Sequence, residues 1–261
     1  VVSHTGKQAG LHTLSLEVSE GSLVLGTTVQ QHVDGAARRQ IRANHSATHL
    51  LQAALQEVLG DHVKQAGSNV TVDRLRFDFT HFSALTVDER RAVESLINQW
   101  VCENAAAETV VMDLEAARAA GAMAMFGEKY DDDVRTVRLG AQSFELCGGT
   151  HVDRVGDIGL FRLLTEGALA AGVRRIEAVT GAAAVQALHL EDQRFADAAA
   201  LLKTSPAQLG DRISGLQARL KESTDALSQL QGQQAAQQAE GLLAQATEVA
   251  GMVTIAAQVE G

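Results

Sequence analysis

Cysteine and histidine side chains recur in two short stretches of the sequence. In "ELCGGTHV", Cys147 and His151 stand four positions apart with two glycines between them, and in "NHSATHLL", His45 and His49 have the same spacing. Thiolate and imidazole are zinc ligands, and a thiol beside an imidazole is also a nucleophile with its base. Each pair taken alone therefore allows a metal half-site, a catalytic pair or an ordinary structural role.

The two pairs taken together favour a metal site. A helix that carries His45 and His49 one turn apart projects both imidazoles from one face, and a glycine turn can bring Cys147 and His151 onto the same ion. Three nitrogens and one sulfur suit zinc better than calcium or magnesium. A Cys147 nucleophile with His151 as its base leaves the helical pair without a role. The spacing leaves open whether His151 closes a structural site or leaves a position for catalysis.

Length and composition limit the class of protein. The chain has 261 residues, 46% of them hydrophobic, which is enough for a buried core. No segment is apolar enough for a membrane span and no secretion signal is evident, so we expect a cytoplasmic protein without a membrane partner. Two cysteines give no disulfide framework.

The net charge of -10 argues against broad, non-specific nucleic-acid binding but not against local contact. Small basic groups remain in "DGAARRQIR" and "GVRRIEAV", and on charge alone we expect their arginines to be solvated or paired with acids: Arg38, Arg39, Arg42, Arg174 and Arg175.

Hydrophobic periodicity predicts an α+β fold. Residues 1–36 alternate in short runs typical of part of a small β-barrel. One helix is expected from an N-cap at Asn44 to Gly60, and a second from a capping box of Thr86 and Glu89. Alternating runs predict the strands of an antiparallel-rich sheet packed by these helices, around "SNVTV", "RLRFDF", "ETVVMDL", "VRTVRLG", "SFELCGG", "GLFRLLTEG" and "VRRIEAVTG".

The composition changes after residue 181. We divide the chain into a partial β-barrel (1–36), a zinc-binding domain (37–181), a helical segment (182–250) and the start of a further domain (251–261). Seam positions from Leu209 to Leu230 recur at alternating spacings of four and three, as in a coiled coil, and all are apolar except Ser223. The helical segment is therefore a candidate dimerisation region, and either an intramolecular hairpin or a homodimer would bury this seam.

The order of "NHSATHLL" and "CGGTH" resembles the editing domain of alanyl-tRNA synthetases. The resemblance extends through "LRFDFTHF", "VMDLEAA", "GAMAMFGEKYDD" and "GDIGLFRLLTEGALAAGVRRIEAVTG", and the helical "LLKTSPAQL" is also similar. Freestanding alanyl-tRNA deacylases share the metal motifs. The sequence lacks the segments expected of that family's aminoacylation domain, so we expect no aminoacylation from this chain.

The resemblance implies a zinc-dependent deacylase that removes serine or glycine from the acceptor end of mischarged tRNA(Ala). It assigns the zinc ligands to the two motif pairs: His45, His49, Cys147 and His151. It also implies that Thr48 meets the serine hydroxyl, that Gln65 lies near the reacting ester and that Arg174 contacts the tRNA. The alternative is a non-catalytic tRNA-binding or assembly module in which zinc is structural.

Overall fold

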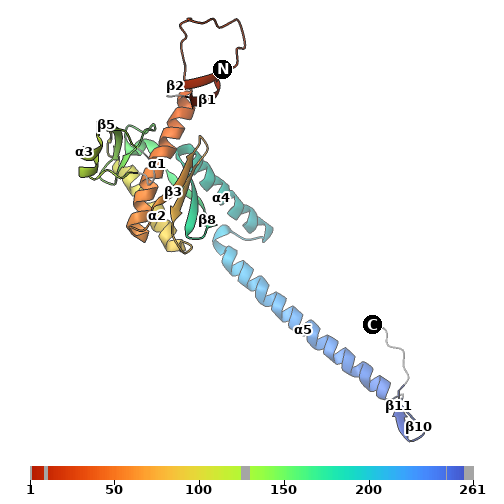
Figure 1. The fold of residues 1–261 in the computed structure, drawn as a ribbon. Coiled ribbons are helices and arrows are strands. Elements are labelled where there is room, and N and C mark those ends of the chain that lie inside the picture. The colour runs from red at the N-terminus through yellow and green to blue at the C-terminus, as the bar shows by residue number, and fades with distance from the viewer. Residues whose placement is uncertain (1, 9–10, 125–129, 245, 256–261) are drawn as a thin grey trace. The chain divides into compact units, whose positions relative to one another are not determined.

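The structure is a computed structural model that describes residues 2–8, 11–124, 130–244 and 246–255. The chain divides into two compact units, Val1–Gly181 and Ala182–Gly261 (Figure 1). Helices and antiparallel sheets alternate in the first unit, which contains all the candidate site residues. The predicted α+β class is therefore confirmed.

A four-stranded antiparallel sheet lies at the centre of the first unit. Its strands follow the order β3-β4-β9-β8, with bounds β3 (Gln65–Val70), β4 (Leu75–Thr80), β8 (Phe161–Ala170) and β9 (Val173–Thr180). The register pairs Phe77 with Ile176 and Asp78 with Arg175. Because side chains alternate between the faces of a strand, one face is apolar and the other carries the Asp78–Arg175 ion pair.

Two helices, α1 (Gly35–Leu59) and α2 (Val87–Glu103), pack side by side against the apolar face (Figure 1). The predicted capping box of Thr86 and Glu89 begins α2. The buried residues of α1 run almost without a break from Ala43 to Leu51 and continue at Ala54 and Leu55, and each buried leucine contributes about 1.5–3 kcal/mol to stability. They belong to one core with residues of α2 and the sheet: Ala47, Leu50, Leu51, Ala54, Leu55, Val93, Ile97, Trp100, Phe77, Phe79 and Phe161. This core fixes the rotation of α1 about its axis.

A second antiparallel sheet carries the cysteine motif. It consists of β5 (Ala107–Asp113), β6 (Asp133–Leu139) and β7 (Ser143–Leu146) in that order, and the short helix α3 (Leu114–Ala119) follows β5. A small core of its own joins α3 to this sheet: Ala117, Ala122, Val134 and Leu146. Since β7 ends immediately before Cys147, the sheet sets the starting point of the loop with the second motif. Residues 125–129 of the stretch "GAMAMFGEKYDD" lie outside the described residues.

The first helix begins earlier than its sequence predicts. Its N-cap is Asp34, whose side chain accepts hydrogen bonds from two backbone amides of the first turn. Asn44 is fully buried inside the helix, where its amide nitrogen donates to the Thr71 carbonyl at 2.9 Å and its oxygen accepts from the Thr180 hydroxyl at 2.7 Å. The prediction of Asn44 as N-cap was wrong because this side chain ties α1 to the central sheet instead of to its own backbone.

An antiparallel hairpin of β1 (Val2–Gln8) and β2 (Leu11–Leu16) precedes α1, and the described part of residues 17–34 forms no strand. The partial β-barrel predicted for residues 1–36 stays a prediction. None of the described helices has the length and apolar character that a membrane crossing requires.

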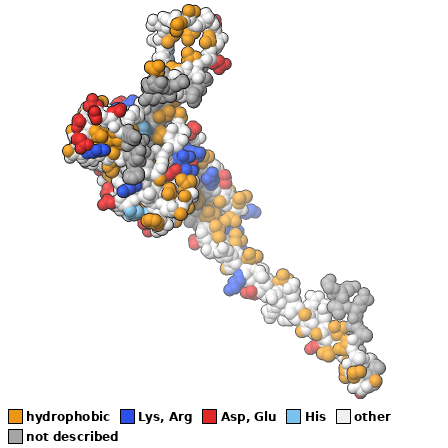
Figure 2. Space-filling model, in the orientation of Figure 1, with side chains coloured by type: hydrophobic (Ala, Val, Ile, Leu, Met, Phe, Trp, Pro, Cys, Tyr) orange, Lys and Arg blue, Asp and Glu red, His pale blue; other side chains and the backbone are white. Residues whose placement is uncertain are grey.

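The second unit is mainly helical. Its elements are α4 (Gly181–Leu201), the 3-10 turn η2 (Pro206–Gln208), α5 (Leu209–Leu243) and a hairpin of β10 (Thr247–Val249) and β11 (Met252–Thr254). No described residue of α5 is buried, and hydrophobic side chains recur along it (Figure 2). The seam from Leu209 to Leu230 is thus free to bind a partner, and dimerisation through it stays a prediction. The start of a further domain at residues 251–261 stays a prediction, and residues 256–261 lie outside the described residues.

Candidate metal centre

Two segments far apart in the sequence meet at the candidate metal centre. His45 and His49 lie one turn apart in α1, and Cys147 and His151 lie in the loop after β7. The ligand atoms that these four side chains offer all lie within 4.8 Å of one another. The three imidazole rings are grouped with centroid distances of 4.3, 5.0 and 5.2 Å. The structure therefore brings together the four residues that the sequence motifs single out.

The two distances from the sulfur to imidazole nitrogens in this cluster fit a tetrahedral metal ion. Sγ of Cys147 lies 3.3 Å from Nε2 of His151 and 3.6 Å from Nε2 of His45. Zinc bonds of about 2.0–2.3 Å in a tetrahedral arrangement separate neighbouring ligand atoms by about 3.3–3.7 Å. Three imidazole nitrogens and a thiolate are also donors that zinc prefers and that calcium and magnesium do not. The residues present thus fit a zinc ion.

Arg135 holds the loop that carries Cys147. Its Nη1 donates to the carbonyl oxygens of Cys147 at 2.8 Å and of Gly149 at 2.6 Å. Gly149 lies directly against the His45 ring, because a β-carbon at this position would stand 2.1 Å from Cε1 of His45. A β-carbon on the neighbouring Gly148 would have no atom within 4 Å. The close approach of the loop to α1 therefore requires glycine at 149 and not at 148.

Two side chains of α1 hold the loop on the His151 side. Oγ of Ser46 lies 3.2 Å from Nδ1 of His151 and accepts a hydrogen bond from the backbone amide of Val152 at 3.1 Å. Arg42 donates to the His151 carbonyl oxygen and forms an ion pair of 2.5 Å with Asp153. Because Ser46 engages Nδ1 of His151, Nε2 is the nitrogen that faces the sulfur.

Glu145 orients His49. Nδ1 of His49 donates to one carboxylate oxygen at 2.6 Å, and the other oxygen accepts from the Ser143 hydroxyl at 3.0 Å. All three side chains are buried. Nε2 of His49 is also buried, and no hydrogen-bond partner for it exists among the described residues. A buried nitrogen without a partner costs about 1–3 kcal/mol, and a metal ion at this position would satisfy it.

The charges in the cluster favour a bound cation. Burial lowers the pKa of His49, but the Glu145 carboxylate and the Cys147 sulfur outweigh it and raise that pKa to about 10. Burial raises the pKa of Cys147, but hydrogen bonds from His151 and His45 and the nearby charge of His49 outweigh it and lower that pKa to about 3. Burial also lowers the pKa of His151. At neutral pH a thiolate and a carboxylate thus surround His49, and a positive charge between them is stabilised.

The other predicted site residues lie on three different elements. Thr48 is buried on α1 between the two histidines, and its hydroxyl donates to the backbone carbonyl one turn earlier at 2.8 Å. Gln65 is half-buried at the start of β3 and donates to the hydroxyl of Ser68 at 3.0 Å. Arg174 lies on β9, where its guanidinium is paired with Glu166. Their roles toward a substrate stay predictions.

Comparison with known proteins supports the resemblance that the motifs indicate. Residues 134–177 match the family model of the threonyl and alanyl tRNA synthetase second additional domain, a range that includes Cys147 and His151. Over 241 residues the chain is 51% identical to the alanine--tRNA ligase of Magnetococcus marinus, which covers 92% of this chain. The chain is homologous to part of an alanine--tRNA ligase. It spans 27% of the length of that relative.

In this homologue of alanine--tRNA ligase, the sequence motifs predict the four residues of the cluster. They do not predict the side chains that hold the histidines and the cysteine loop in place: Ser46, Arg42, Arg135 and Glu145. Glu145 carries a usable signal, because a residue two positions before Cys147 in a strand points to the same side. Ser46 stands next to His45 in the motif itself. No sequence pattern links Arg135 to the cysteine loop, since the pairing of β6 with β7 creates that contact.

We predict that Gly149→Ala weakens zinc binding about 10-fold or more, whereas Gly148→Ala leaves it within about twofold of wild type. The added methyl group at 149 displaces the His45 ring, and the one at 148 meets no atom. Chelator competition on the two purified variants measures the affinities. The two glycines are adjacent in one loop, so both substitutions restrict the unfolded chain to the same extent. The difference in zinc affinity between the two variants therefore reports the contact with the His45 ring. Equal zinc affinities would contradict the proposed approach of the loop.

We also predict that zinc binding at pH 7 releases about one proton from His49, because a pKa of about 10 keeps this imidazole protonated in zinc-free protein. Cys147, with a pKa of about 3, is already ionised and releases none. Below pH 10 the apparent zinc affinity therefore falls as pH decreases, by about tenfold per pH unit from His49 alone. Calorimetry in two buffers of different ionisation enthalpy counts the released protons.

Glu145→Gln is the matched variant for this measurement. The neutral amide keeps the shape of the side chain but no longer stabilises a proton on His49, so proton release at pH 7 decreases. The same proton release from wild type and Glu145→Gln would show that the carboxylate does not control the charge of His49.

Proposed function

We propose that this chain hydrolyses the ester of serine or glycine wrongly attached to tRNA(Ala), with zinc as its cofactor. The observation that carries the proposal is a cluster of three imidazoles and a thiolate beside a cavity, in a homologue of alanine--tRNA ligase. The ligands would be His45, His49, Cys147 and His151. Zinc, when bound, supplies a positive charge that polarises an ester or makes water more acidic.

A hydrolytic site separate from the site that selects the amino acid overcomes a limit of selection by size. A pocket that accepts alanine admits the smaller glycine, and it rejects an added hydroxyl only weakly. A site that hydrogen-bonds the serine hydroxyl can instead cleave the serine ester and spare alanine, because alanine leaves the polar atom of the site unpaired. Accuracy is thus gained from a hydrogen bond that the wrong amino acid makes and the right one cannot.

Thr48 is the residue that we assign to this hydrogen bond. It lies between the two histidines on α1, and its hydroxyl proton is directed to a backbone carbonyl. The lone pairs of the hydroxyl oxygen therefore remain available to accept the proton of a serine hydroxyl. We assign Gln65 to positioning the ester, since its amide lies at the first residue of β3 and is partly accessible.

A nucleophilic role for Cys147 has weaker support. Its sulfur lies within hydrogen-bonding distance of both His45 and His151, although a nucleophile needs one base. That role also leaves the buried Nε2 of His49 without a partner among the described residues. A ligand role for Cys147 accounts for all three imidazoles.

The proposal predicts that the zinc-loaded chain deacylates Ser-tRNA(Ala) and Gly-tRNA(Ala) about 100-fold or more faster than Ala-tRNA(Ala). Thr48→Val should reduce the rate on the serine ester more than on the glycine ester, because only serine loses a hydrogen bond. Cys147→Ala should lose zinc and turnover together, whereas the matched variant Cys102→Ala should keep both, since Cys102 is an exposed residue of α2. Release of labelled amino acid and metal analysis of the same samples provide the measurements.

Each alternative gives a different result. No hydrolysis by a folded, zinc-loaded wild type would contradict the enzymatic proposal and favour a non-catalytic tRNA-binding module with a structural zinc. A Cys147→Ala variant that keeps its zinc but loses turnover would favour the nucleophile.

A further inference from the structure

A basic cavity opens beside the candidate metal centre. Its volume of about 420 Å³ is within the usual range of small-ligand sites. The lining that matters consists of two residues of the ligand loop, three arginines and one acid: Thr150, His151, Arg38, Arg42, Arg135 and Asp153. The cavity therefore borders the metal cluster at His151.

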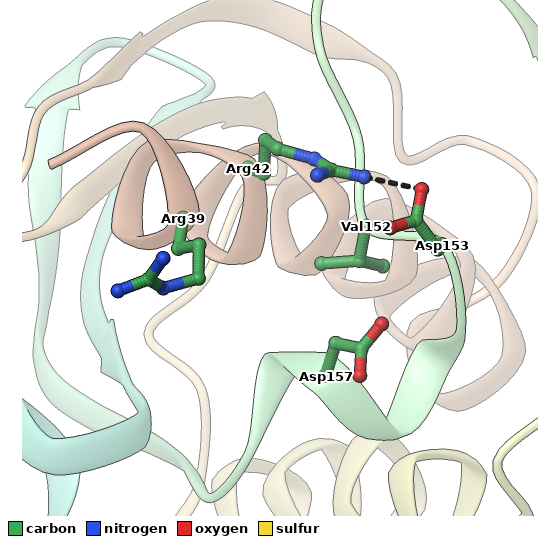
Figure 3. Close-up of a pocket in the computed structure, with 5 residues that line it drawn as sticks. All are labelled: Arg39, Arg42, Val152, Asp153 and Asp157. Atoms are coloured by element: carbon green, nitrogen blue, oxygen red, sulfur yellow. Dashed lines mark hydrogen bonds and ion pairs between the residues drawn. The ribbon is translucent and has the colours of Figure 1, made fainter. Parts of the chain in front are cut away.

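A second cavity of about 290 Å³ adjoins the first, with Arg42 and Asp153 in both linings. Figure 3 shows Arg39 and Arg42 projecting from the same helix, with Arg42 directed to Asp153. Asp153 and Asp157 balance these two arginines in the second cavity, so the excess of positive charge belongs to the first cavity.

The charge of the first cavity is positive in a chain whose net charge is -10. Asp153 is the only carboxylate among the described residues that line it, and it pairs with Arg42. Arg135 donates to neutral carbonyl groups, which leave its charge unbalanced. Within the described part of the chain, the side chain of Arg38 is exposed and forms no hydrogen bond or ion pair. Two guanidinium groups are therefore left for an anion.

Arg38 and Arg42 lie on the same face of α1 as two of the metal ligands. Arg38, Arg42, His45 and His49 follow one another at spacings of four, three and four, which places them on one face of the helix. Arg38 and His45 are separated by about 10 Å along the axis. An anion at Arg38 would thus lie within the reach of one nucleotide from a group held at the metal.

We infer that this cavity is a phosphodiester subsite, formed by Arg38 and Arg135 with the Asp153-paired Arg42 also in its lining, for the terminal nucleotide whose ribose carries the ester. The inference rests on the proposed function. A nucleotide that bears the aminoacyl ester on its ribose has a phosphodiester on its 5′ side, so one ligand occupies both the metal centre and the arginines. Arginine suits this role because its planar fork donates two hydrogen bonds to a phosphate.

The subsite gives RNA a local basic contact on an acidic chain. The subsite also assigns the contact with RNA to residues other than Arg174, whose guanidinium is already paired with Glu166. Arg42 and Arg135 additionally hold the loop of Cys147 and His151, so a bound phosphate would touch the same side chains that position the ligands.

Arg38→Gln tests the subsite, because this residue takes no part in holding the loop. Arg91→Gln is the matched control, since it removes the same charge from an exposed position on α2. On a seryl-RNA hairpin that mimics the acceptor stem, we expect Arg38→Gln to lower kcat/KM about tenfold or more. On a seryl ester of adenosine, which has no phosphate, we expect no change. Arg91→Gln should match wild type on both substrates.

Binding of the same RNA hairpin without an amino acid separates this inference from the proposed function. By fluorescence anisotropy with the zinc-loaded chain, Arg38→Gln should weaken binding and reduce the slope of log affinity against log salt by about 0.7, whereas Arg91→Gln should do neither. This result supports the subsite even if wild type hydrolyses nothing. Equal effects of the two variants on RNA binding, or an equal loss on seryl-RNA and seryl-adenosine, would overturn it.

Discussion

The arrangement of the first unit depends on holding one thiolate among three imidazoles in a largely buried cluster. These groups carry polar atoms that are costly to bury unless each finds a partner. Their ligand atoms nevertheless lie within 4.8 Å of one another, and Nε2 of His49 has no hydrogen-bond partner in the described residues. A zinc ion at the centre would resolve this cost, because it would replace several weak contacts with bonds to all four donors.

The rest of the unit supplies the rigidity that such a cluster requires. The core under α1 fixes the direction of His45 and His49, and the buried side chain of Asn44 joins the helix to the sheet in the turn before them. Arg135 holds the cysteine loop through two of its carbonyl groups. Ligands on a rigid helix and on a loop with hydrogen bonds on both sides are well placed to bind a metal ion.

The sequence allowed most of the fold and the cluster residues to be predicted, because both rest on local patterns. Alternation predicted the strands of the two sheets, and the spacing of His45 and His49 placed both on one helical face. Apart from the meeting of the two metal motifs, contacts between distant segments could not be predicted. Asn44 has the composition of an N-cap but serves as a tertiary link, and the position of Arg135 behind Cys147 depends on strand pairing.

The direct test of the central claim is the zinc X-ray absorption spectrum of the purified chain, supported by its zinc content. The account predicts one zinc per chain with one sulfur at about 2.3 Å and nitrogen ligands at about 2.0–2.1 Å. In Cys147→Ala the sulfur contribution should disappear, whereas Cys102→Ala should retain it. A chain that binds no zinc, or a zinc whose spectrum contains no sulfur, would contradict the assignment of His45, His49, Cys147 and His151 to one metal centre.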